Sequence, residues 1–208
     1  MRKPAKVARV SAIVLAAGAS TRMGRTKQLL PLGGRTMLEQ TLGNVRACDV
    51  EEIILVLGAS AEAIRGQLPG ALLSGLTVVV NLAYGQGIAA SLRHGLAAVG
   101  RDSDAAMIVL GDQPFVQPKT LDRILAEYRR TRGLIVIPVY QGKRGNPVLL
   151  DRSVFPQARL LEGDTGFRAL FQNNLEGIVK VEVEDGGILM DIDEPEDYLR
   201  FGKAGKLP

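Results

Sequence analysis

The sequence predicts one α/β domain in which helices cover both faces of a mostly parallel, Rossmann-like sheet. Apolar, β-rich runs alternate along the chain with stretches of helical periodicity. Several runs are apolar throughout, residues 53–57 among them, as expected of strands that are covered on both faces. This alternation favours a doubly wound sheet in three layers, and the 208 residues fit a single domain of ordinary size.

The elements of the first two thirds follow in a regular order. We expect strands over residues 10–17, 52–57, 76–80, 105–110 and 134–139. Helical patterns lie between them, over residues 36–47, 59–68, 88–99 and 118–131. Parallel strands need crossover connections of about this length, so each helix is expected to return the chain to the start of the next strand.

The last third changes character but belongs to the same domain. Residues 146–150 indicate a short strand, and residues 152–161 and 165–172 have helical patterns. We expect residues 177–183 and 188–192 to form a hairpin around the turn 184–187, and Pro195 suits the first turn of a closing helix. No repeat and no linker rich in Ser, Gly or Pro divides the chain. We therefore assign residues 1–208 to one domain, with tails at 1–9 and 201–208.

Composition narrows the classes of partner. The net charge is +4, the basic residues are dispersed and there is no tryptophan to stack on bases, so nucleic-acid binding is unsupported. No apolar run approaches the roughly 20 residues that span a bilayer, and we expect a soluble protein without a membrane partner. The single cysteine, Cys48, excludes an intrachain disulfide and suits a reducing, cytoplasmic setting.

The loop after the first strand is the strongest candidate for binding phosphate. It places Gly18 and Gly24 among the cations Arg22, Arg25 and Lys27. Glycine lets the backbone turn tightly and present N–H groups to phosphate oxygens, and the cations supply the opposite charge. The loop matches neither the Walker A pattern nor the dinucleotide fingerprint, because its glycines are spaced differently from both. A secretory signal peptide is the alternative for the N-terminus, but it leaves the spacing of these residues unexplained.

The same loop resembles the signature Leu-Ala-Ala-Gly-x-x-x-Arg-Met-Gly-x-x-Lys of MobA-like nucleotidyltransferases, which are related to the molybdenum cofactor enzymes. The resemblance continues through five ordered motifs from Ile13 to Tyr198 and implies a glycosyltransferase-A-like fold. It also implies that the matching residues bind the nucleotide. They are Leu15, Ala16, Ala17, Gly18, Arg22, Met23, Gly24 and Lys27.

Asp112 is the candidate metal ligand of a second motif, residues 107–114. It follows an apolar strand, and in open α/β sheets ligands bind at the carboxyl ends of the strands. A carboxylate there suits Mg²⁺, which prefers one or two carboxylates together with phosphate oxygens. The alternative role for Asp112 is to cap the helix that begins near Pro118. A capping residue would have to lie closer to Pro118 in the sequence than Asp112 does. Gly-Asp-Gln-Pro also resembles the cofactor cytidylyltransferases at this point.

Acidic residues gather again near the C-terminus. Asp191 and Asp193 would project from one face of an extended strand and repel each other unless a cation or solvent separates them. A similar segment in the resembled family implies that Asp193 joins Asp112 around Mg²⁺, with Asp191 as the substitute candidate. The resemblance also implies that Asp112 binds the nucleotide. Three further acids are expected to occupy the first turn of a helix, where its dipole favours them, namely Glu194, Glu196 and Asp197.

Residues 81–95 carry a third glycine motif. The resemblance implies that Gly87 and Ser91 border the base and ribose of the nucleotide. Taken alone, residues Gly85 to Ala90 satisfy Gly-x-Gly-x-x-Ala, a dinucleotide-binding variant that an NAD-dependent oxidoreductase would use. Four residues separate it from the preceding strand, where the fingerprint needs a tight turn, so this match is weak.

Two loops of the last third are candidates for binding the second substrate. Residues 142–148 and 161–168 combine glycines with cations and amides, and both resemble segments of the cofactor cytidylyltransferases. The acceptor-binding residues that the resemblance implies are Arg144, Asn146, Asp164 and Arg168. Charged loop tips that only face water are the alternative.

The resemblance implies transfer of a nucleoside monophosphate from an NTP to a phosphorylated acceptor, with release of pyrophosphate. In the molybdenum branch the acceptor is molybdopterin, and transient contact with a molybdoenzyme or its chaperone is implied. A phosphate is ionised near pH 7 and needs no general base, so catalysis reduces to charge neutralisation and alignment. We assign catalysis to Arg22, which balances the pyrophosphate, to Lys27, which stabilises the α-phosphate, and to Asp112 with Mg²⁺.

Ala17 favours CTP over GTP as the nucleotide. Ala16-Ala17-Gly18 resembles the cytidylyltransferase branch, whereas guanylyltransferase relatives tend to carry Ala-Gly-Gly, and a side chain at Ala17 would narrow the space beside the base. Four alternatives stay open: a guanylyltransferase, a sugar- or polyol-phosphate nucleotidyltransferase, an NAD-dependent oxidoreductase that uses residues 85–90, and a nucleotide sensor without catalysis.

Overall fold

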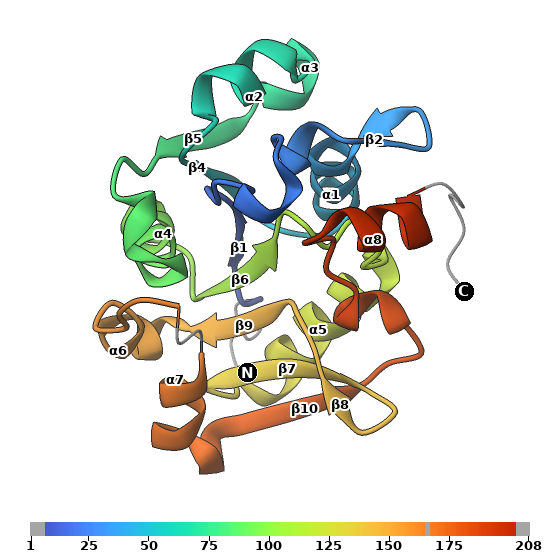
Figure 1. Cartoon of the computed structure of the whole chain (residues 1–208). Coiled ribbons are helices and arrows are strands. Elements are labelled where there is room, and N and C mark those ends of the chain that lie inside the picture. Colours follow the sequence, from blue (N-terminus) through green and yellow to red (C-terminus); the bar gives the residue numbers. More distant parts are fainter. Residues whose placement is uncertain (1–6, 165–166, 203–208) are drawn as a thin grey trace.

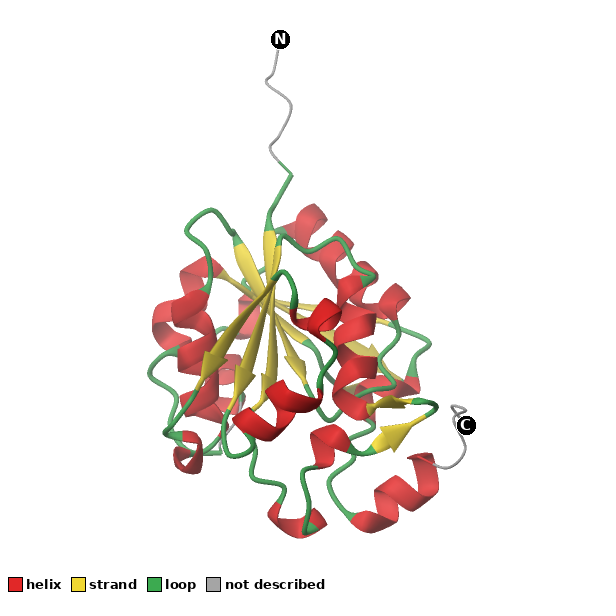
Figure 2. Ribbon diagram, turned by 90° about the horizontal axis from the view of Figure 1, so that it is seen from above, coloured by secondary structure: helices red, strands yellow, loops and turns green. Residues whose placement is uncertain are grey.

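A twisted, mostly parallel sheet runs through the molecule, and helices cover both of its faces (Figures 1 and 2). The computed structural model describes residues 7–164 and 167–202. Within them the strand order is β10–β7–β9–β6–β1–β4–β5, with β8 added beside β7. The strands of this sheet are β1 (Val10–Ala16), β4 (Glu52–Leu57), β5 (Leu76–Val80), β6 (Ala105–Leu110), β7 (Ile135–Tyr140), β8 (Lys143–Arg144), β9 (Val148–Asp151) and β10 (Ile178–Glu182).

The remaining elements connect these strands. A small antiparallel ribbon pairs β2 (Pro31–Leu32) with β3 (Arg35–Thr36). The longer helices return the chain between parallel strands, and the short ones lie in the connections. They are α1 (Met37–Arg46), α2 (Ala61–Gln67), α3 (Gly70–Leu73), α4 (Ile88–Ala98), α5 (Pro118–Thr131), α6 (Phe155–Ala158), α7 (Arg168–Asn173) and α8 (Pro195–Asp197).

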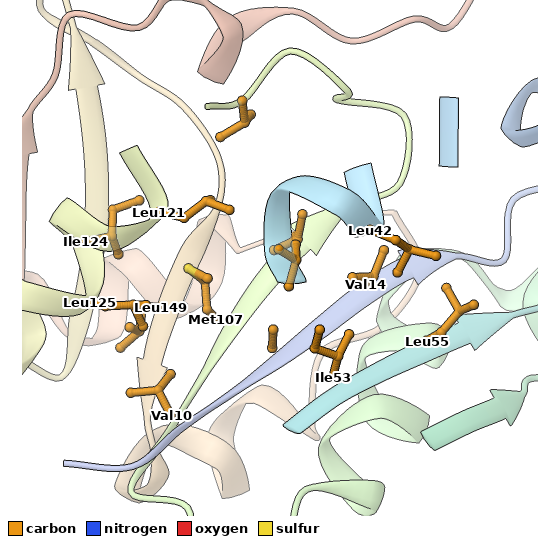
Figure 3. Close-up of a cluster of buried hydrophobic side chains, with 14 of the residues drawn as sticks. Val10, Val14, Leu42, Ile53, Leu55, Met107, Leu121, Ile124, Leu125 and Leu149 are labelled. Atoms are coloured by element: carbon orange, nitrogen blue, oxygen red, sulfur yellow. The ribbon is translucent and has the colours of Figure 1, made fainter. Parts of the chain in front are cut away.

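The central strand β1 shows why both faces of the sheet are apolar. Successive side chains of a strand point to opposite faces. Val14 packs in the cluster formed with α1, α2 and α5, part of which Figure 3 shows, while Ile13 packs in the cluster formed with α4, α6 and α7. Every residue of β1 is buried and all but Ser11 are apolar, and the Ser11 hydroxyl is hydrogen-bonded to Glu52 and Ser103. The prediction of a sheet covered on both faces is confirmed.

The last third joins the same sheet in a way that the local pattern does not reveal. β9 inserts between β6 and β7 and is antiparallel to both. β10 runs parallel to β7 at the sheet edge, so the predicted hairpin of residues 177–183 and 188–192 is wrong. Residues 186–189 form a 3₁₀ turn instead of a returning strand.

The buried side chain of Asp185 explains this turn. Its carboxylate accepts hydrogen bonds from Gly187 N at 3.0 Å, from Gln117 N at 2.9 Å and from the Thr120 hydroxyl at 2.7 Å. It thereby caps the N-terminus of α5, where a negative charge is also favoured by the helix dipole. The chain bends after β10 to place this cap, and it cannot return as a hairpin.

Replacing Asp185 with alanine should lower the free energy of unfolding by about 2–4 kcal/mol, because it leaves several buried donors without an acceptor at once. Urea denaturation followed by circular dichroism measures the change. Asp49→Ala is the matched control, since the Asp49 side chain is 82% exposed and should contribute almost nothing. Equal stability of the two variants would contradict the role given to Asp185.

Two of the sequence expectations fall partly outside the described residues. The predicted tails include residues 1–6 and 203–208, and the helix expected over 165–172 includes residues 165–166. Within the described part, that helix is α7 and begins at Arg168. None of the helices in the described ranges is long and apolar enough to cross a membrane.

Candidate functional site

A pocket of about 490 Å³ opens at the carboxyl ends of β1 and β6. One wall is the loop that follows β1, and the opposite wall is the N-terminal part of α4 with the loop that precedes it. Eleven of the residues singled out in the sequence line it together. They are Leu15, Ala16, Ala17, Gly18, Arg22, Lys27, Gly87, Ser91, Asp112, Asp164 and Asp193.

The loop after β1 is held in shape from behind. Gly24 adopts φ +64°, a left-handed conformation that suits glycine, and it closes a 3₁₀ turn over Thr21–Met23. Met23 packs under this turn in a small apolar cluster with Met37 and Ile192, and it does not line the pocket. Met23 and Gly24 therefore shape the loop from outside the pocket wall.

Gln28 is a pocket residue that the sequence analysis missed. Its side chain is buried, and its amide nitrogen lies 3.3 Å from Ala16 O and 3.4 Å from Gly18 O, so that it ties the two ends of the glycine turn together. No local sequence pattern identifies this role, because it depends on two carbonyls that the fold brings within reach of the amide. The length and amide group of Gln28 suit a bridge between two carbonyls.

Lys27 lies between two carboxylates that are remote in sequence. Its ammonium nitrogen is 2.6 Å from Asp112 Oδ2 and 2.6 Å from Asp193 Oδ1, and only 12% of the side chain is exposed. Burial alone would lower the pKa of Lys27, but the two carboxylates outweigh it and raise the pKa above its ordinary value. The lysine is thus firmly cationic at the centre of the site.

The main chain sets the position of Asp193. Ile192 N donates to Asp112 O at 3.1 Å, which joins the two acidic segments directly. The Asp197 carboxylate accepts from Asp193 N at 3.1 Å and from Glu194 N at 3.0 Å, as expected for acids at the start of a helix. Arg22 reaches Asp193 Oδ2 at 3.5 Å from the exposed side of the pocket.

Asp191 lies near this group of charges but is hydrogen-bonded to a different side chain. Gln113 donates its side-chain amide to Asp191, and Asp191 has no ion pair with Lys27. Burial, followed by repulsion from the nearby Asp112 carboxylate, raises the pKa of Asp191. Of the two acids weighed in the sequence, Asp193 is the one that contacts the central lysine.

The acidic pair suits a divalent cation that is also held by phosphate. Asp112 Oδ1 is buried and has no hydrogen-bond partner among the described residues, so one oxygen ligand is unused. No cluster of three or more His, Cys, Asp or Glu side chains in the described chain could complete a metal site by itself. Mg²⁺ normally takes one or two carboxylates and substrate phosphates for the rest of its ligands, which this donor set matches.

The opposite wall is built around Gly87 at the N-terminus of α4. Asp164 accepts a hydrogen bond from Ile88 N at 2.9 Å, so its carboxylate caps α4 inside the pocket. A 3₁₀ turn over Tyr84–Gln86 separates β5 from α4. The tight strand–turn–helix that a dinucleotide fingerprint needs is therefore missing at residues 85–90.

Gly87→Ala should weaken nucleotide binding roughly tenfold or more. Gly87 has φ +90°, and an added Cβ would lie 2.5 Å from the Gly163 carbonyl carbon and 2.7 Å from an Asp164 carboxylate oxygen. An alanine at position 87 would therefore be strained in its backbone, and its Cβ would collide with the segment around Asp164 and displace it. Calorimetric titration with an NTP measures the change. Gly66→Ala, on α2 and with open space around its Cβ, is the control because Gly66 does not line the pocket, and equal affinities of the two variants would contradict the prediction.

Two of the other predicted acceptor residues, Arg144 and Asn146, are absent from the lining of this pocket. The Arg144 guanidinium stacks 5.9 Å from the centre of the Phe171 ring, and Asn146 N donates to Ile188 O at 3.1 Å. Neither residue lines the pocket described above. The Arg168 side chain is outside the described part, and of the three acceptor residues whose side chains are described only Asp164 shares the pocket with the glycine loop.

Solved structures with the same architecture include proteins of appreciable sequence similarity. Rv0371c of Mycobacterium tuberculosis H37Rv is 35% identical and superposes with a TM-score of 0.85, over 95% of this chain and 100% of that one. A structure of the same protein in complex with manganese is 34% identical, with a TM-score of 0.82 over 94% and 99% of the two chains.

Curated relatives of similar length carry different names. A nicotine blue oxidoreductase of Paenarthrobacter nicotinovorans is 30% identical over 92% of this chain and 96% of its own length. A molybdenum cofactor cytidylyltransferase of Escherichia coli K12 is 28% identical over 91% of this chain and 94% of its own. The names agree on no single substrate, so the family is better defined than the reaction.

The family itself follows from the length of chain that its model matches. The MobA-like NTP transferase domain matches residues 12–178, which contain the glycine loop, Asp112 and the strands that carry them. The nicotine blue oxidoreductase relative is similar over nearly its whole length as well. The chain therefore belongs to the MobA-like NTP transferases, a family of nucleotidyltransferases.

Proposed function

We propose that the chain transfers CMP from CTP to the terminal phosphate of a molybdopterin-type cofactor and releases pyrophosphate. The observation that carries the proposal is the convergence of Lys27, Asp112 and Asp193 beside a glycine loop in one pocket. A triphosphate is the small-molecule group that needs backbone N–H donors, cations and a metal-binding acid pair together.

The role of each group follows from its position. The backbone N–H groups at Ala17 and Gly18 bind the triphosphate, and Lys27 stabilises charge on the α-phosphate that is transferred. Arg22, which is 64% exposed at the rim, neutralises the departing pyrophosphate. The attacking phosphate is already ionised near neutral pH, so the pocket aligns two anions and removes no proton.

Asp112 and Asp193 would hold a divalent cation, for which we propose Mg²⁺. The unused buried oxygen of Asp112 supports this, as does the relative whose structure contains manganese. When bound, such an ion neutralises charge on the phosphates as a Lewis acid. Lys27 would then stabilise the phosphates of the nucleotide beside this ion.

CTP and a molybdopterin-type acceptor are supported by the relative named molybdenum cofactor cytidylyltransferase and by Ala17 in the pocket wall. The test is pyrophosphate release with CTP, GTP, UTP and ATP, each with and without a molybdopterin-type cofactor. We expect release with CTP and the cofactor together, and none with CTP alone. A strong preference for GTP would overturn the choice of base, and release with a sugar phosphate in place of the cofactor would overturn the acceptor.

The relative named nicotine blue oxidoreductase supports a second candidate, a redox reaction in the same pocket. Residues 85–90 would then bind the dinucleotide, but the 3₁₀ turn before Gly87 disfavours that binding mode. Oxidation of NADH or NADPH, followed at 340 nm with quinone-like dyes as acceptors, tests it. Turnover there without pyrophosphate release from any NTP would replace the first proposal with the second.

A further inference from the structure

Ser20 connects the buried side chain of Gln28 to the backbone of Lys27. Ser20 is half-buried in the pocket wall, its hydroxyl lies 3.3 Å from Gln28 Oε1, and Lys27 N donates to the same hydroxyl oxygen at 3.1 Å. Gln28 is 2% exposed, and its other end reaches the carbonyls of Ala16 and Gly18. The two side chains therefore join the start, the middle and the end of the glycine loop.

The partners of the Gln28 amide show which way it is oriented. A carbonyl oxygen can only accept, so the end that faces Ala16 O and Gly18 O is Nε2, which carries one hydrogen for each of them. The other end, Oε1, can only accept, so the Ser20 hydroxyl donates to it and accepts from Lys27 N. Donors and acceptors thus alternate along the whole chain of bonds, and hydrogen bonds linked in this way strengthen one another.

The backbone of Ser20 needs this support. Its φ is +54°, in the left-handed region that a serine adopts less readily than a glycine. A residue stays in such a conformation only when its surroundings hold it there, and here the bonds to Gln28 and Lys27 do so. The shape of the loop is therefore set by its own side chains before any ligand binds.

The same bonds decide which backbone group of the loop is free for a ligand. In a planar trans peptide the C=O and N–H groups point in opposite directions, so the Gly18 carbonyl that faces Gln28 turns the N–H of Ala19 away from it. Ala19 lines the pocket, and its N–H has no hydrogen-bond acceptor in the part of the chain that the structure describes. A free N–H attracts a phosphate, whereas a carbonyl oxygen in its place would repel it.

We propose that Gln28, acting with Ser20, is a positioning residue that preorganises the glycine loop for the phosphates of the nucleotide. It holds a carbonyl oxygen away from the phosphates and leaves the neighbouring N–H free to donate to them. A loop that already has its bound shape loses less conformational freedom on binding, and so it binds more tightly. The inference rests on the proposed function, since it concerns the triphosphate of the bound NTP, but it depends neither on the base nor on the acceptor.

The test is equilibrium binding of CTP and of inorganic tripolyphosphate, each with Mg²⁺, measured by titration calorimetry. Gln28→Met keeps the length of the side chain but cannot bridge the carbonyls and the serine. It should weaken both ligands by the same factor, roughly tenfold, because both bind through the phosphates. Gln40→Met is the matched control, since Gln40 is a half-buried glutamine of α1 that donates to Asn44 and does not line the nucleotide pocket.

A second variant tests whether the two side chains act through one chain of bonds. Ser20→Ala should weaken tripolyphosphate about threefold or more, and Gln28→Met should then cost much less in the Ser20→Ala background than in the wild type. Losses that simply add overturn the shared role. The serine variant remains decisive where Gln28→Met does not fold, because Ser20 is only half-buried and an unchanged affinity in Ser20→Ala overturns the inference as well.

Turnover separates positioning of the loop from a general loss of structure. In Gln28→Met the KM for CTP should rise more than kcat falls, because Lys27 keeps its contacts with Asp112 and Asp193. A fall in kcat that exceeds the rise in KM overturns the inference.

The titrations also distinguish the inference from the proposed function. A wild type that binds CTP no more tightly than Gln28→Met does overturns the role of Gln28 and leaves nucleotidyl transfer in place. A wild type that binds neither CTP nor tripolyphosphate overturns the proposed function itself.

Discussion

Replacing Lys27 with methionine should lower kcat for nucleotidyl transfer by about 10²–10³-fold, the usual cost of removing one charge that stabilises a transition state. Lys27 is 12% exposed and lies 2.6 Å from each of two carboxylates, so no solvent cation replaces it easily. Methionine keeps the length and the apolar stem of the side chain, and the loop should keep its shape. KM for CTP should rise less than kcat falls, because the charge matters most when the α-phosphate is transferred.

Single-turnover release of pyrophosphate measures this loss without interference from product release. Lys119→Met is the matched control, because Lys119 is exposed on α5 and lines no part of the pocket. Circular dichroism shows whether both variants are folded. Turnover within threefold of the wild type in Lys27→Met would remove Lys27 from the mechanism.

The meeting of the glycine loop with Asp112 could be predicted from the sequence. Each follows a buried and mostly apolar strand, and parallel strands that are neighbours bring their carboxyl ends to the same edge. β1 and β6 are such neighbours, with Leu15 paired to Leu110. Two loops that begin one or a few residues after these positions must therefore face each other across the sheet edge.

Asp193 and the end of the chain could not be placed by the same reasoning. No strand pattern brings Asp193 to β6, and only the resemblance to relatives pointed to it. Its position depends on the bond from Ile192 N to Asp112 O and on the route of the chain after β10. That route is set by the cap from Asp185 to α5, a contact between segments that local periodicity cannot connect.

The polar groups behind the pocket were hidden for a related reason. Gln28 looks like an ordinary loop residue, and its role appears only when its buried amide meets two carbonyls and the Ser20 hydroxyl. Sequence patterns report which residues are buried in a helix or strand, because burial there is periodic. They do not indicate which polar side chain forms hydrogen bonds with the backbone of a given loop.

Asp112→Asn should lower kcat on the order of 10³-fold and flatten the dependence of the rate on divalent metal. The substitution keeps the size of the side chain, but it removes the charge that faces Lys27 and replaces one carboxylate oxygen with a donor. Its orphaned Oδ1 makes no hydrogen bond that the fold depends on, so the variant should fold normally. Rates are measured over a wide range of Mg²⁺ and Mn²⁺ concentrations. The metal concentration that gives half of the maximal rate should rise at least tenfold.

Asp191→Asn is the control that separates charge from position. Asp191 is a nearby acid of the segment that carries Asp193, but it is hydrogen-bonded to Gln113 and forms no ion pair with Lys27. An asparagine there can still accept from the Gln113 amide. Its rate should fall less than tenfold and its metal dependence should match the wild type. If Asp191→Asn lost as much activity as Asp112→Asn, the second acid at the cation would be Asp191, and the contact between Asp193 and Lys27 would be only structural.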